Sequence, residues 1–162
     1  MKRIMMMVLL VIFTIIGFAQ AQGIGFAQAQ GTKEAVETVK KIDAVLTMGI
    51  SFIDYGRLMG ESNYVMQGYL NKAKNEPLDN AIKEAWGLYV LAKRTWTNIE
   101  GEPARYISRS VNQTEFDALM KIPGMSKTIV GGSIAVELAL PIIWENASKK
   151  VKLITSLTSN WK

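Results

Sequence analysis

The residues of this chain that could carry chemistry are three carboxylates set among apolar neighbours, Asp54, Glu61 and Glu137. Two carboxylates held close together act as acid and base in glycoside hydrolysis, so a defined pair would be a strong catalytic signal. The spacing of these three singles out no pair. A Ser-x-x-Lys pattern occurs at Ser159 to Lys162, on the last residue of the chain, where chance explains it. The sequence therefore predicts no catalytic residue.

Two residue types are missing from the 162-residue chain, histidine and cysteine. Histidine is the commonest general base and zinc ligand, and cysteine supplies thiolate nucleophiles, disulfides and haem attachment points. Their absence excludes the Ser-His-Asp triad, the zinc hydrolases and the Glu-x-x-His di-iron bundle. No glycine-rich phosphate or dinucleotide motif follows a strand-like segment. We expect a non-enzymatic protein with no metal and no cofactor.

The composition is that of one globular domain with a short appendage, since 49% of the residues are hydrophobic and 20% are charged. The net charge is +5, and Lys2 and Arg3 at the extreme N-terminus supply two of these charges. No long basic run alternates with aromatic residues, and Lys149, Lys150 and Lys152 form only a small cluster. A nucleic-acid partner is therefore not expected.

The N-terminus is typical of an export signal. Lys2 and Arg3 precede the apolar stretch from Ile4 to Phe18, and Ala19-Gln20-Ala21 supplies a small-x-small cleavage site. Residues 1–21 are accordingly predicted to be a signal peptide, and the mature protein to be periplasmic or extracellular. A retained membrane anchor is the alternative, although about 15 apolar residues are few for a span.

A tandem duplication follows the first cleavage site. The octapeptide IGFAQAQG occupies Ile16 to Gly23 and recurs at Ile24 to Gly31, which places a second cleavage site after Ala29. Two copies of eight residues are too few and too short for a solenoid. We expect residues 22–31 to be a linker and residues 32–162 to be the folded domain.

The domain is predicted to be all-α because its apolar residues recur at helical spacing and nowhere alternate as in a sustained strand. The spacing predicts a helix over 33–59, bent at 60–63 and resuming over 64–74, and a second over 77–100. A short helix is expected over 114–121, preceded by a capping box at Asn112. The last helix begins after Ser126 and contains Pro141, which should kink it. The expected architecture is an antiparallel bundle of about four helices with a kinked C-terminal helix.

Glycines are predicted to mark close helix contacts. Gly49, Gly56 and Gly60 lie on the seam of the first helix, where they would form a groove for a neighbouring helix. Gly131 and Gly132 would provide the matching contact on the last helix. Glu137 falls on a narrow polar stripe of that helix and is expected to face solvent.

The candidate interaction residues are aromatic and basic. The tryptophans can pack in the core or line an apolar pocket between helices, and the basic loop around Tyr106 can meet an anionic partner. The candidates are Trp86, Trp96, Trp144, Arg105, Tyr106 and Arg109.

These observations favour an exported helical protein that binds another component of the cell envelope, most simply a protein partner. Homo-oligomerisation is compatible with the same features. Two alternatives are a carrier of small apolar ligands and a membrane-active protein that contacts the bilayer through residues 128–144.

Overall fold

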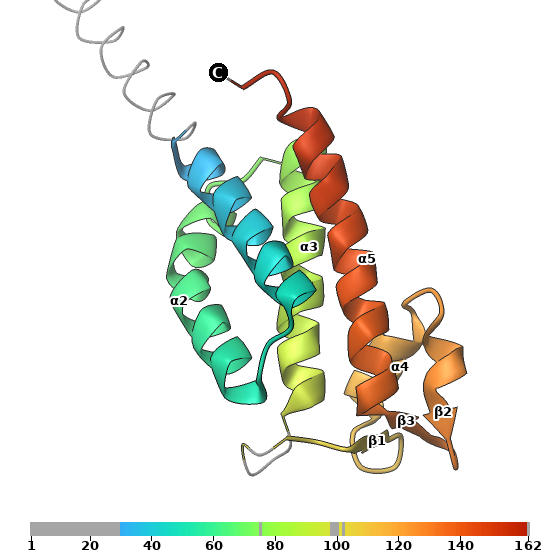
Figure 1. The fold of residues 1–162 in the computed structure, drawn as a ribbon. Coiled ribbons are helices and arrows are strands. Elements are labelled where there is room, and N and C mark those ends of the chain that lie inside the picture. Colours follow the sequence, from blue (N-terminus) through green and yellow to red (C-terminus); the bar gives the residue numbers. More distant parts are fainter. Residues whose placement is uncertain (1–29, 75, 98–100, 102, 162) are drawn as a thin grey trace, which may run out of the picture.

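The computed structural model describes residues 30–74, 76–97, 101 and 103–161, and these residues form mostly helix with one small sheet. The long helices lie side by side and run alternately in opposite directions (Figure 1). The expected antiparallel helical arrangement is therefore present among the described residues. The helices are the segment 30–48, α2 (Phe52–Leu70), α3 (Pro77–Trp96), the short α4 (Gln113–Met120) and α5 (Val136–Leu157).

Several predictions about the chain's N-terminal part lie outside the described residues. These are the signal peptide at 1–21, the cleavage after residue 29, and most of the linker at 22–31. Residues 30 and 31, the end of the duplicated octapeptide, already belong to helix 30–48. The end of the predicted helix 77–100 also lies outside, at residues 98–100.

The first long helix ends at residue 48, so the prediction of one helix over 33–59 is wrong. Gly49 has a φ of 87°, a left-handed conformation that terminates helices and that glycine adopts without steric cost. The next helix then starts with its own cap, because the Ser51 hydroxyl oxygen accepts a hydrogen bond from the Asp54 backbone N–H at 3.1 Å. α2 runs without interruption through 60–63, where a bend was expected.

The predicted close-contact role of the glycines is also wrong within the described chain. A Cβ placed on any of Gly49, Gly56, Gly60, Gly131 and Gly132 would meet nothing within 4 Å. The first lies in the turn between two helices, the next two lie within α2, and the last pair forms a turn between strands. Backbone conformation explains the glycines at three of these positions, because Gly49, Gly131 and Gly132 all have positive φ values.

Substitutions at two of these glycines are expected to change stability in opposite directions. Gly49→Ala should lower the free energy of unfolding by about 1–2 kcal/mol, because alanine is strained at positive φ. Gly60→Ala should raise it by about 0.5–1 kcal/mol, because alanine favours the helix and the added Cβ has room. Urea denaturation of both variants measures the two values. A stabilising Gly49→Ala would mean that the helix continues through residue 49.

The described chain is mostly helical, but it also contains a small three-stranded antiparallel sheet, and two of its strands lie where the last helix was predicted to begin, so the helix prediction is wrong there. The strands are β1 (Tyr106–Ser108), β2 (Ile129–Val130) and β3 (Ser133–Ala135), in the order β1-β3-β2. Gly131 and Gly132 have φ values of 57° and 81°, which suit the two-residue turn between β2 and β3. Only from Val136 onward is the segment 127–144 an α-helix, and a 3₁₀ turn (Met125–Thr128) precedes β2.

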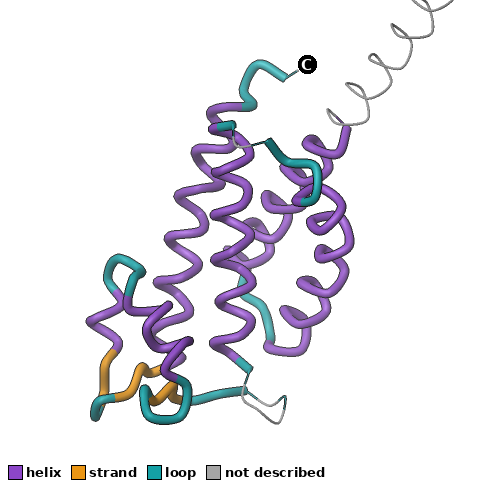
Figure 2. Tube along the Cα trace, turned by 180° about the vertical axis from the view of Figure 1, so that it is seen from behind, coloured by secondary structure: helices purple, strands orange, loops and turns teal. Residues whose placement is uncertain are grey.

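Register explains which side of the sheet is buried. Ile134 of β3 pairs with Ile107 of β1 and with Ile129 of β2, so these three side chains share one face. On this face Ile134 is fully buried and Ile107 nearly so, while Ile129 of the edge strand β2 is 40% exposed. Tyr106 lies on the opposite face, and its side chain is 59% exposed. The sheet and α4 together lie at one end of the long helices in both views (Figures 1 and 2).

A chain of hydrogen bonds crosses the core and connects all four long helices. Tyr89 of α3 donates its hydroxyl to Asp43 of helix 30–48 at 3.3 Å, and Ser148 of α5 donates to the same carboxylate at 3.4 Å. Tyr55 of α2 donates its hydroxyl to the backbone carbonyl of Tyr89 at 2.8 Å. Buried polar groups that are satisfied in this way favour one arrangement of the helices over others.

Two smaller predictions concern helix boundaries. The Asn112 side chain accepts a hydrogen bond from the Glu115 backbone N–H at 3.2 Å, which confirms the predicted cap of the short helix. Pro141 lies inside α5, and the helix continues on both sides of it. The kink at Pro141 stays a prediction. Glu137, in the first turn of α5, is exposed as expected.

Candidate functional site

The most suggestive concave feature is a groove where helix 30–48 stops part way along the bundle and the chain continues to the start of α2 (Figures 1 and 2). Residues 49 and 50 form one wall, the end of α3 and the residues leading into β1 form the second, and the first turns of α5 form the third. The groove has a volume of about 610 Å³, within the range of ligand-binding sites. Because Arg105, Tyr106, Glu137 and Pro141 line it and are exposed, the groove is open to solvent.

Aromatic rings from three helices support the groove. Trp96 of α3 and Trp144 of α5 line it and meet edge to face, with ring centroids 5.6 Å apart. Tyr55 of α2 lies 5.8 Å from each of them, and Phe52 lies 5.6 Å from Trp96. Such contacts between rings add to the stability that their burial provides. The wall of the groove is therefore large, apolar and held from several sides.

The buried polar groups behind the aromatic wall, the Tyr55 hydroxyl and the Trp144 indole, lie in an environment that favours their neutral forms. Burial raises the pKa of the Tyr55 hydroxyl far above its ordinary value, and the nearby Trp144 indole opposes only part of that shift. The Trp144 Nε1 atom is itself buried, and no acceptor among the described residues meets hydrogen-bond geometry with it. Since the Tyr55 hydroxyl already donates to Tyr89, this cluster stays uncharged at neutral pH.

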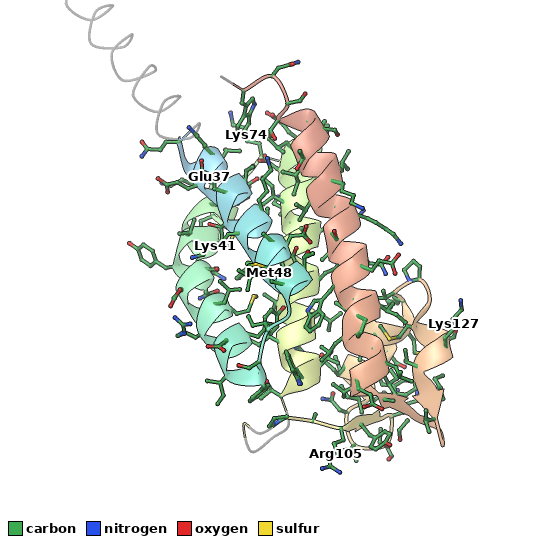
Figure 3. All side chains as sticks on the ribbon, in the orientation of Figure 1. Glu37, Lys41, Met48, Lys74, Arg105 and Lys127 are labelled. Atoms are coloured by element: carbon green, nitrogen blue, oxygen red, sulfur yellow. The ribbon has the colours of Figure 1, made fainter. Side chains whose placement is uncertain are left out.

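The rim of the groove carries one charge of each sign. Arg105 and Glu137 both line it, and neither forms an ion pair with a described residue. The Val136 backbone N–H donates to the Arg105 carbonyl at 2.9 Å, so the two charged residues are carried by adjoining segments. The Arg105 side chain points away from the bundle (Figure 3). The rim can therefore interact with a charged surface while the aromatic wall stays apolar.

The groove brings together four of the six candidate interaction residues, Trp96, Trp144, Arg105 and Tyr106. The other two lie elsewhere. Trp86 is only 5% exposed and belongs to the core. Arg109 forms an ion pair with Asp117 at 3.1 Å and lies 5.9 Å from the centre of the Phe116 ring.

Sequence reasoning missed the apolar wall residues that come from outside the aromatic set, among them Ile50, Leu140 and Val136. A signal for the site did exist. Gly49 followed by Ser51-x-x-Asp54 is a helix stop followed by a helix start, which predicts a break in the first helix. The tryptophans near that break would then have been expected to line a gap.

The buried charged residue Glu115 was not among the candidates, and its environment is that of a structural group. Its carboxylate side chain is 3% exposed and forms an ion pair with Arg94 at 2.7 Å, while the Thr95 hydroxyl donates to it at 3.4 Å. Paired carboxylates of this kind are common in ordinary helix contacts. Within the described ranges no three acidic residues gather in a group that could hold a metal ion.

Two further features bear on the expected site. A second concavity of about 430 Å³ lies between residues 30–34 and 64–73. Among the described helices, none is long and apolar enough to cross a membrane.

Comparison of the chain with protein-family models, with curated proteins and with solved structures finds no match. The site must therefore be interpreted from its own geometry.

Proposed function

We propose that this chain is an exported, non-enzymatic helical protein that binds another component of the cell envelope through the groove over Trp96 and Trp144. The observation that carries the proposal is the convergence of an open apolar groove, two tryptophans and an exposed tyrosine at one place. Tryptophan, tyrosine and arginine are the residues that most often dominate the energy of binding at protein interfaces.

The surroundings of the groove support a protein partner. Several large apolar side chains are exposed close to it in sequence. Met48 precedes the lining residue Gly49 and is 78% exposed, and Leu138 follows Glu137 and is 46% exposed. Exposed apolar residues around a concave centre are typical of interaction sites. A segment of a partner with apolar side chains would cover them, and its charged flanks would meet Arg105 and Glu137.

The non-enzymatic part of the proposal rests on residue types. The sequence has no histidine and no cysteine, and the groove contains one carboxylate, Glu137, which is exposed. General acid–base catalysis requires a positioned group whose pKa is tuned for proton transfer. A groove with this lining is suited to binding.

A carrier of small apolar molecules is the second candidate, favoured by the volume of the groove and its tryptophan wall. Small-ligand sites usually bury most of the ligand's surface. Because the groove is open on the side of Tyr106, a partner segment fits it better. Tryptophan fluorescence titrated with fatty acids tests the carrier directly, and an unchanged spectrum would exclude it for that ligand class.

The proposed site can be tested by photocrosslinking from two matched positions. Tyr106 at the groove and Tyr64 on α2 are both exposed, at 59% and 88%, so a photoreactive phenylalanine analogue at either place leaves the core intact. We expect one protein adduct of defined mass from position 106 in the producing cell and none of that mass from position 64. Equal adducts from both positions, or none from 106, would contradict the groove as the binding site.

A further inference from the structure

A second surface lies at the opposite end of the bundle from the sheet. The start of helix 30–48, the connection from α2 to α3 and the last turns of α5 lie together at this end (Figure 1). The Lys40 ammonium donates to the Thr158 hydroxyl oxygen at 3.5 Å, which ties the first of these segments to the last.

This end carries an apolar stripe that the described residues leave uncovered. Leu153 and Leu157 lie one helical turn apart on α5 and are 46% and 43% exposed. Trp161 lies beyond the C-terminal end of α5, after the turn at residues 158–160, and is 47% exposed. Leucine and tryptophan are the apolar side chains that typically enter the interface where a helical protein contacts a membrane surface.

The charges at this end are mainly positive. Its five lysines outnumber its four carboxylates, Glu34, Glu37, Glu76 and the buried Asp79, and none of those lysines forms an ion pair with a described carboxylate. Lys74 points outward from this end (Figure 3). A second copy of the chain would place like charges against each other, whereas an anionic lipid surface complements them. The lysines are Lys33, Lys40, Lys72, Lys74 and Lys152.

We propose that this end of the bundle binds an anionic phospholipid surface, with Leu153, Leu157 and Trp161 in the interface and the lysines at the headgroups. The groove, near the other end, then faces away from the lipid and stays accessible to its partner.

Vesicle co-sedimentation tests the proposal with the protein as isolated from the exporting cell. We expect binding to vesicles that contain phosphatidylglycerol, little binding to phosphatidylcholine alone, and a loss of binding as salt is raised. Leu153→Gln with Leu157→Gln should lower the partition coefficient by about tenfold or more, since both apolar contacts are lost. Brominated lipids should quench the fluorescence of the wild type and quench Trp161→Phe less.

Leu138→Gln is the matched control, because Leu138 lies on the same helix with the same 46% exposure but near the sheet. It should bind vesicles as the wild type does. Equal binding to both lipid compositions, no binding to anionic vesicles, or equal weakening by the control and the double variant would each overturn the proposal. Thermal unfolding of the variants confirms that they are folded.

Discussion

Raising the pH above 10 is expected to unfold the protein steeply. Tyr55, Tyr69 and Tyr89 are at most 5% exposed, and burial is the leading cause that raises the pKa of each far above its ordinary value of 10.0. For Tyr69 and Tyr89 a second cause acts in the same direction. Their hydroxyls face the carboxylates of Asp79 and Asp43, which disfavour the tyrosinate form.

The direction of this change in stability follows from the number of protons that the folded and the unfolded chain bind. Between pH 10 and the raised pKa values the unfolded chain has lost protons that the folded chain keeps, so stability falls as the pH rises. Below pH 10 the three buried tyrosines make their full contribution to the free energy of unfolding. Each buried tyrosine lowers the free energy of unfolding by about 1.4 kcal/mol per pH unit in this window, and three together by about 4 kcal/mol. A domain stable by about 5–15 kcal/mol should unfold within a few pH units.

Tyrosinate absorbance and urea denaturation measure this behaviour together. Tyr55, Tyr69 and Tyr89, three of the five tyrosines, should ionise only when the chain unfolds. Tyr89→Phe should reduce the slope of stability against pH by about a third, while Tyr64→Phe should leave it unchanged. Ionisation of these three buried tyrosines near pH 10 in the folded protein would contradict the described core.

Shortening Ile143 is expected to cause a large loss of stability at neutral pH. Ile143 is fully buried on α5, which packs extensively on α3. Ile143→Ala should lower the free energy of unfolding by about 2–5 kcal/mol, because it removes buried apolar area and leaves a cavity. The urea midpoint at pH 7 measures the change.

Leu138→Ala is the control for this prediction, since Leu138 lies on the same helix but is 46% exposed. Its effect should stay below about 1 kcal/mol. If the two variants lost equal stability, the face of α5 that is assigned to the core would be wrong.

The helical content of the chain could be predicted because local signals and burial agree along most of it. Pro77 marks the start of α3, Asn112 caps α4, and both follow from side-chain chemistry within one turn. The apolar spacing of α2, α3 and α5 identified these segments as helical. Gly49 and the Ser51 cap are local signs of where the first helix ends, but the seam of apolar residues continues through them and by itself favours one long helix.

The sheet could not be predicted from periodicity. β1, β2 and β3 are two or three residues long, too short for an alternating pattern to be distinguished from a helical one. The one local sign was Gly131-Gly132 between short apolar runs, which is a hairpin signal. The pairing of β3 with β1 joins residues that are far apart in the sequence, and no local pattern records it.

The sequence predicted which residue types would form the candidate site, but it did not predict which of those residues lie together at the groove. Tryptophans and basic residues were identified, but only the fold separates Trp86 in the core from Trp96 and Trp144 at the groove. The same holds for Arg105 and Arg109, of which one is free at the rim and the other is paired with Asp117. Helical spacing shows which side chains share a face and does not show where a neighbouring helix ends.

The most direct test of the account is the affinity of the partner, once crosslinking has identified it, for two variants of the purified protein. Tyr106→Asp places a carboxylate at the groove, and Tyr64→Asp makes the same change at an exposed site on α2. Calorimetric titration should show that Tyr106→Asp weakens binding by about tenfold or more while Tyr64→Asp binds as the wild type does. Unchanged affinity in Tyr106→Asp, with the fold intact, would contradict binding at the groove.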